Sequence, residues 1–172
     1  PQLFLLNSAD CGVPQRRERV FFCAVRDDIK VSPLKLAPTH RWISTEESCC
    51  DVDSGPGHAR PNDLKYWPIT KPGESYSNTK KRLGEKEGCF SHIRLHGERP
   101  SGTLTANLQT LTHWKYPREL NLAEVKRLGS FPDDYHAKTD KIGKYMIGMS
   151  VPPKMTEQVA RAVCEQWLGV KY

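Results

Sequence analysis

The chain lacks several features that would place it in other classes of protein. It has no run of about 18 apolar residues, so no membrane span is expected. It has no charged-then-apolar leader, so no secretion signal is expected. None of its six cysteines forms a C-x-x-C pair, and the histidine pair His92 and His96 has no cysteine pair at zinc-finger spacing. We therefore expect free thiols in a reducing cytoplasm and no metal site.

The composition describes a basic chain with one modest core. Of 172 residues, 37% are hydrophobic and 27% are charged, which suits one domain or one domain with a small lobe. The 13 prolines indicate much loop. The net charge of +6 favours an anionic partner, although charge alone fits an ordinary basic protein equally well.

Two apolar segments near the start predict strands. Residues 3–6 and 20–25 are short apolar runs typical of buried strands, joined by loop chemistry and arginines into a hairpin-like unit. The first run has no lead-in before it. We therefore expect further sequence upstream that completes a larger sheet.

Local signals predict three helices. Ser44 can cap a short helix with Glu46 and Glu47 in its first turn. Asn121 and Glu124 have the spacing of a capping box, whose helix stops at Gly129. A last helix begins at Pro152-Pro153 and ends before Gly169. Its apolar residues recur every fourth position: Met155, Val159, Val163 and Trp167.

Three arginines stand within four residues in GVPQRRERV, residues 12–20. In an extended segment Arg17 and Arg19 share a face, because side chains alternate. A guanidinium suits phosphate, or an oxygen that gains negative charge during a reaction. A salt-bridged cluster at a sheet edge is the alternative.

Four segments, in order, resemble motifs of the DNA cytosine-5 methyltransferases. LNSADCGVPQRRERVFFCAVR (6–26) is similar to motif VIII, with its Q-x-R-x-R core, and ERPSGTLTAN (98–107) to motif IX. RELNLAEVKRLGSFPDDY (118–135) resembles the segment that follows, and YMIGMSVPPKM (145–155) resembles motif X. Together they span nearly the whole chain.

The resemblance implies a reaction and roles within it. The family transfers a methyl group from S-adenosylmethionine to C5 of a cytosine flipped out of double-stranded DNA. A cysteine thiolate attacks C6, and a glutamate engages N3. Arg19 matches the arginine that contacts the cytosine O2, where electron density accumulates. Arg17 then supports the pocket and a neighbouring phosphate, and Gln15 orients the loop beside the DNA.

Motif X implies the cofactor-closing residues. Gly148, Met149 and Ser150 would supply backbone atoms and a hydroxyl near the methionine moiety of S-adenosylmethionine. Met149 stands where the family usually has asparagine, which puts that side-chain contact in doubt. A tight turn before a helix is the alternative for this stretch.

The segment between motifs VIII and IX corresponds to the family's target-recognition region. Base edges carry sequence information, while phosphate contacts set position. The expected DNA-binding residues, besides Gln15, are Lys80, Lys81, Arg82, His92, Arg94, Arg99, Thr103 and Thr105. Any single lysine among them could instead belong to a solvated loop.

The expected fold is the C-terminal portion of a Rossmann-like α/β methyltransferase with a small, irregular, mostly-β target-recognition lobe. We expect a strand hairpin over residues 1–32, a linker and lobe over 33–113, and returning helices over 114–172. The glycine-rich cofactor loop, the Pro-Cys nucleophile and the Glu-Asn-Val motif of the family are absent. These missing motifs predict that the chain is one part of an enzyme and needs an N-terminal half for activity. A degenerate DNA-binding remnant without catalysis is the alternative.

Overall fold

A computed structural model describes residues 1–53, 55–86, 92–107 and 110–170. The elements, in chain order, are β1 (Gln2–Asn7), η1 (Ser8–Cys11), β2 (Glu18–Cys23), α1 (Thr45–Ser48), α2 (Pro61–Tyr66), η2 (Trp67–Ile69), α3 (Tyr76–Arg82), β3 (Ile93–Arg94), β4 (Leu111–Thr112), α4 (Leu122–Leu128), α5 (Asp140–Met149) and α6 (Pro153–Trp167). No described helix is long and apolar enough to cross a membrane. The fold is mixed α/β with small sheets, in agreement with the predicted class.

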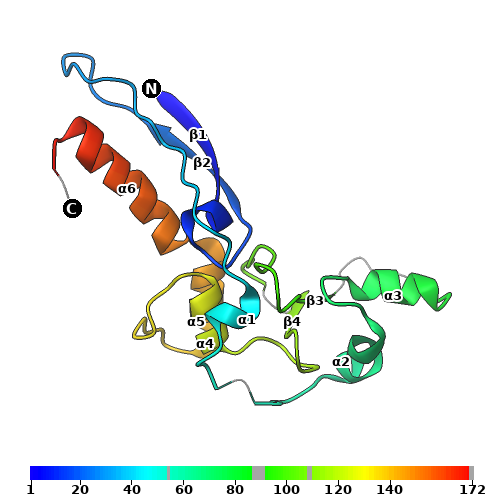
Figure 1. Ribbon diagram of the computed structural model, residues 1–172. Coiled ribbons are helices and arrows are strands. Elements are labelled where there is room, and N and C mark those ends of the chain that lie inside the picture. The colour runs from blue at the N-terminus through cyan, green and yellow to red at the C-terminus, as the bar shows by residue number, and fades with distance from the viewer. Residues whose placement is uncertain (54, 87–91, 108–109, 171–172) are drawn as a thin grey trace.

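Strands β1 and β2 form the predicted antiparallel hairpin, in a register that pairs Leu3 with Phe22 and Leu5 with Val20. One face packs on α6, and the three elements run side by side in Figure 1. The prediction that these strands are buried is wrong for the other face. Its four apolar side chains are 47–76% exposed: Leu3, Leu5, Val20 and Phe22. Apolar residues occupy both faces of the hairpin, and the described part of the chain covers only one of them.

Helix α6 confirms the periodic pattern of the sequence. Met155 and Val159 are buried against the hairpin, and Trp167 donates its indole N–H to the Ser32 carbonyl at 2.9 Å. Gly169, with φ +68°, follows the helix in the left-handed conformation that stops a helix. The helix therefore fixes one side of the hairpin.

A second core lies under α4 and α5. It contains Leu104, Leu111, Val125, Leu128 and Ile147. Helix α4 has the predicted capping box, in which Asn121 and Glu124 exchange hydrogen bonds of 2.8 Å. Helix α5 was not predicted.

The predicted lobe contains α2, η2, α3, β3 and β4, at the end of the molecule away from the two chain termini (Figure 1). The lobe is irregular, but the expectation that it is mostly β is wrong for its described residues. Helices α2 and α3 span six and seven residues, whereas the parallel strands β3 and β4 span two each. The short helix after Ser44 forms as predicted, with the Ser44 hydroxyl accepting from the Glu47 amide.

Candidate functional site

Arg17 joins three segments that are distant in sequence. Its guanidinium donates to the Leu104 carbonyl at 2.5 Å and to the Gly148 carbonyl at 3.0 Å, and the residue is only 4% exposed. Burial, and then the neighbouring charge of Arg19, lower the pKa of Arg17. Because both bonded nitrogens point into the chain and the residue is buried, the expected phosphate contact is not available to Arg17 in this structure.

Gln15 is buried beside Arg17. Its side-chain oxygen accepts from the Leu104 amide at 2.9 Å, and its own carbonyl accepts from the Ser8 hydroxyl at 2.5 Å. The backbone of Ser101 pairs with this loop, donating to Pro14 and accepting from Arg16. The side chain is 2% exposed, so the expected DNA contact is not available to it in this structure, and the loop-orienting role remains.

Arg19 stands at the rim of a shallow cavity of about 550 Å³. The side chain is partly buried, and one guanidinium nitrogen donates to the Glu18 carbonyl at 2.6 Å. Arg16 and Thr103 line the same cavity, where the Thr103 hydroxyl donates to the Arg16 carbonyl at 2.9 Å. The residues that line the cavity thus include two arginines, a threonine and one acidic residue, Glu18. Sequence reasoning counted Arg16 among the three arginines but gave it no role.

Gly148 allows α5 to press on the backbone of motif IX. A Cβ at this position would lie 2.2 Å from the Thr105 carbonyl oxygen, so only glycine fits. Its own carbonyl is held by Arg17. Neighbouring Met149 is 61% exposed, and the Ser150 hydroxyl donates to the Met146 carbonyl at 2.7 Å. Of the three residues expected near the cofactor, Gly148 is occupied by contacts within the chain, and Met149 faces outward.

Three of the predicted DNA-binding side chains are already engaged by the chain itself. Arg94 lies 3.6 Å above the Trp67 ring and donates to the Thr70 carbonyl at 3.0 Å. His92 lies 3.3 Å from the carboxylate of Asp63. Arg82 pairs with Glu74. These contacts stabilise the lobe. They also occupy hydrogen-bond donors of the three side chains that the expected DNA contacts would need.

The remaining predicted DNA-binding residues differ in their exposure to solvent. Lys80 lies over the Tyr66 ring at 4.9 Å and is partly buried. Lys81 and Arg99 are exposed, as are Thr103 and Thr105. The Thr105 hydroxyl donates to the Asn107 carbonyl at 3.1 Å.

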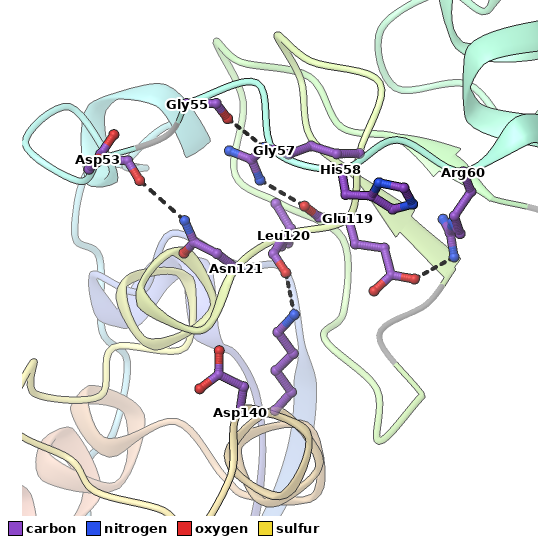
Figure 2. Close-up of a pocket in the computed structure, with 11 residues that line it drawn as sticks. Asp53, Gly55, Gly57, His58, Arg60, Glu119, Leu120, Asn121 and Asp140 are labelled. Carbon is purple, nitrogen blue, oxygen red and sulfur yellow. Dashed lines mark hydrogen bonds and ion pairs between the residues drawn. The ribbon is translucent and has the colours of Figure 1, made fainter.

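The junction between the lobe and the helices surrounds a mixed-charge pocket of about 580 Å³ (Figure 2). Arg118 donates to the Gly55 carbonyl at 2.8 Å and forms a two-point ion pair with buried Glu124. Across the pocket, Arg60 pairs with Glu119 at 2.5 Å. Figure 2 shows Arg60 paired with Glu119 and Asn121 bonded to Asp53 at the pocket wall.

Two of the described cysteines, Cys11 and Cys49, are buried thiols whose environment disfavours the thiolate. Burial raises the pKa of the Cys11 thiol to about 11, with Asp10 adding to the effect, and burial likewise raises that of Cys49 to about 11. Cys11, Cys23, Cys49 and Cys50 form no disulfide, and Cys89 lies outside the described residues. Among the described residues, no three histidine, cysteine or acidic side chains gather into a metal site.

Comparisons with known proteins agree on the family and the fold. The family model for C-5 cytosine-specific DNA methylases matches residues 2–165. The chain is 32% identical to the type II methyltransferase M.BbvI of Brevibacillus brevis, over 98% of this chain and 50% of that protein. It is 27% identical to M1.HphI of Haemophilus parahaemolyticus, over 92% and 46%. The chain thus spans about half the length of these curated relatives.

The fold is also similar to solved methyltransferases. A DNA modification methyltransferase encoded within an E. coli prophage superposes with a TM-score of 0.65 at 16% identity, covering 99% of this chain and 61% of that one. The Entamoeba histolytica methyltransferase EhMeth superposes with a TM-score of 0.55 at 13% identity, covering 95% and 53%. At these identities the likeness concerns the fold alone.

Proposed function

This chain belongs to the C-5 cytosine-specific DNA methylase family, and we propose that it is the C-terminal part of a DNA (cytosine-5)-methyltransferase acting on a specific site in double-stranded DNA. In this proposal it contributes the arginine side of the cytosine pocket and the target-recognition lobe. The nucleophile and most of the cofactor site come from an N-terminal half, and the complete enzyme works in the cytoplasm.

The observation that carries the proposal is the placement of Arg17 and Arg19, two residues apart, in a buried and an open environment. Arg17 is locked between the Leu104 and Gly148 carbonyls, directly before the strand that carries Arg19. Arg19 therefore projects from a backbone that Arg17 and the β1–β2 ladder fix, and it lines an open cavity. When a thiolate attacks C6 of cytosine, electron density moves towards O2 and N3. A fixed guanidinium at O2 stabilises that developing charge without having to reorganise.

The dependence on an N-terminal half has separate support. The sequence contains no Pro-Cys dipeptide, and the buried thiols of Cys11 and Cys49 have raised pKa values. The outer face of the β1–β2 hairpin, defined by Leu3, Leu5, Val20 and Phe22, exposes apolar side chains that a sheet partner would bury. Contiguous exposed apolar residues of this kind mark interaction surfaces.

S-adenosylmethionine fits this chain only at an edge. Met149 and Ser150 offer one exposed thioether and one hydroxyl already bonded to the Met146 carbonyl. These groups are too few to bind the cofactor, so the proposal assigns its binding to the N-terminal half.

Reconstitution tests the proposal. This chain is mixed with a candidate N-terminal half that contains a glycine-rich loop, Pro-Cys and Glu-Asn-Val. Transfer of labelled methyl groups to duplex DNA is then measured for the mixture and for each half. We expect transfer only from the mixture. Turnover by this chain alone would contradict the need for a second half. DNA binding without transfer in any mixture would favour the non-catalytic remnant.

A further inference from the structure

A buried carboxylate joins the predicted lobe to the helices that follow it. Glu124, in the first turn of α4, is fully buried. Its two oxygens accept from the Arg118 guanidinium at 2.7 and 3.0 Å, and one of them lies 3.3 Å from Nε2 of His113. His113 directly follows β4 of the lobe and is 1% exposed. We call these three residues the junction cluster.

The His113 ring is held in one orientation that faces Glu124. Its Nδ1 accepts from the backbone amides of Lys115 and Tyr116, at 2.8 and 3.2 Å. Burial lowers the pKa of His113 more than the Glu124 carboxylate raises it, so the ring is neutral at about pH 7 and carries its proton on Nε2. The ring also stacks on Trp114, with centroids 3.7 Å apart. Turning Nε2 away from the carboxylate would break both amide bonds.

The junction cluster also holds a second segment that crosses between the lobe and the body, the part of the chain formed by the hairpin and α4–α6. Arg118 donates to the Gly55 carbonyl at 2.8 Å, in the segment that enters the lobe. Gly57 lies against the same side chain, because a Cβ there would lie 2.5 Å from Arg118 Cδ. Figure 2 shows this segment beside the one that leaves the lobe, where Asn121 is bonded to the Asp53 carbonyl. The entering and leaving segments therefore meet at one ion pair.

A buried ion pair is a weak source of stability. Removing two charges from water offsets most of their attraction, and a well-packed apolar pair would hold the segments as firmly. What the ion pair adds is direction, since the planar Arg118 fork meets both oxygens of Glu124 in one geometry. Such a buried polar network favours a single arrangement. The junction cluster is therefore suited to fix the angle between the lobe and the body.

Helix α4 connects the junction cluster with the arginines of motif VIII. The helix ends at Leu128, which shares a core with Ile147 of α5. The next residue, Gly148, accepts the hydrogen bond from Arg17 through its carbonyl. Arg17 in turn precedes the strand that carries Arg19. A continuous packed path thus runs from the base of the lobe to the cavity that Arg19 lines.

We propose that Glu124, acting through Arg118 and His113, is a positioning residue that fixes which cytosine of the bound duplex reaches Arg19. The inference rests on the proposed function and goes beyond it, because it assigns the alignment of lobe and pocket to side chains that are too buried to touch DNA. A fixed lobe places the duplex at one offset from the pocket. A lobe that shifts by one base step, about 3.4 Å along a strand, presents the neighbouring nucleotide instead.

The test uses His113→Asn in the reconstituted enzyme. An asparagine oxygen replaces Nδ1 as the acceptor for the two amides, so the local turn is kept while the group that faces Glu124 is lost. Bisulfite sequencing of a methylated random duplex library gives the preferred flanking bases and the position of the methylated cytosine among them. We expect the same preferred bases, with the ratio of main-site to neighbouring-site methylation lowered roughly 10- to 100-fold, the scale of a misplaced reacting group.

Arg118→Lys is an independent variant, because it keeps the charge beside Glu124 and loses the two-point bond. It should lower the same ratio. Tyr76→Phe is the matched control, since it removes a buried hydrogen bond to Asp63 inside the lobe and leaves the junction cluster intact. A variant that only lowers the folded fraction loses rate in proportion at every cytosine, so its ratio does not change.

Failure of this inference and failure of the proposed function look different. Circular dichroism verifies that each variant chain folds, and Arg118→Lys decides alone if His113→Asn does not. An unchanged ratio in either folded variant would overturn the inference while methylation persists. An equal loss of the ratio in Tyr76→Phe would overturn it too, because any weakening of the lobe would then suffice. Absence of methylation by the wild-type mixture would instead overturn the proposed function.

Discussion

Arg17 and Arg19 are separated by one residue and have different environments. Arg17 donates hydrogen bonds to two backbone carbonyls of distant segments. Arg19 donates one hydrogen bond to the carbonyl of the adjacent Glu18 and lines a cavity. Sequence spacing predicted that the two side chains share a side of the segment. It could not predict this division, because the carbonyls that hold Arg17 come from residues 104 and 148.

The division predicts a large catalytic effect at Arg19. In the reconstituted complex, Arg19→Ala should lower the single-turnover rate of methyl transfer by roughly 10²-fold or more, the scale of losing one preorganised donor. Arg19→Lys should also be slow, because lysine keeps the charge and loses the planar donor fork. Duplex affinity should change far less. Arg26→Ala, which removes an exposed arginine paired with Asp28, is the charge-matched control. A near-normal Arg19→Ala rate would make these arginines purely structural.

At the scale of elements, helices with a local signal were predicted, and the others were not. The Asn121 capping box and the apolar repeat of α6 lie in contiguous sequence, so both were found. Helix α5 was missed because its buried face consists of Gly143, Ile147 and Gly148, and glycines give no apolar periodicity. The lobe helices were missed because polar contacts hold them in place of an apolar stripe.

Helix α5 gives a prediction on close packing. Gly148→Ala should lower the free energy of unfolding by at least about 2 kcal/mol, because the added methyl group meets immobile Thr105 backbone. The helix propensity gained, about 1 kcal/mol, is too small to offset this. Gly143→Ala in the same helix meets the flexible Leu122 side chain at 2.9 Å and should cost less. Urea unfolding of both variants decides, and equal effects would contradict the backbone contact.

The lobe gives a prediction on pH. Burial alone would raise the pKa of Asp63, but hydrogen bonds from His92 and Arg60 outweigh it and hold the pKa at about 2. The folded pKa thus lies below the unfolded value of 3.8, so the unfolded state binds more protons between them. This contribution is present above the unfolded pKa and is lost as the pH falls towards the folded one.

Asp63→Asn measures this contribution. The variant should be less stable than wild type by about 2 kcal/mol at neutral pH, and the difference should narrow as the pH falls below about 4. Asp28→Asn, at an exposed ion pair, should show no such trend. The readout is urea unfolding between pH 7 and 3. A difference that stays constant over this range would mean that Asp63 does not carry the pH dependence.

For the whole molecule, the family motifs predicted the protein family better than they predicted which side chains meet in space. Their order along the chain indicated a methyltransferase, and the family comparison confirms the assignment. The meeting of residues 17, 104 and 148 depends on how α5 and the hairpin pack, which no local pattern encodes. His92 and Arg94 were expected at DNA because they lie in the segment that corresponds to the family's target-recognition region. Their neighbours Asp63 and Trp67 engage them first.

The exposed hairpin face gives the last prediction, which concerns assembly. Leu5 and Phe22 are 63% and 76% exposed, and burying such side chains contributes about 1.5–3 kcal/mol each. An aspartate in that face would have to lose its hydration on assembly with the N-terminal half, which costs several kcal/mol. Leu5→Asp should therefore abolish reconstituted methyl transfer.

The matched control is Leu64→Asp, because Leu64 is 59% exposed on α2 in the lobe. It should leave assembly with the N-terminal half intact, as measured by sedimentation of the mixture.

The isolated Leu5→Asp chain should also aggregate less than wild type, since it replaces part of an exposed apolar surface. Because the side chain points away from α6, the substitution should not unfold the hairpin, which circular dichroism of the isolated chain verifies. Full assembly and activity of Leu5→Asp would show that this face does not meet the N-terminal half.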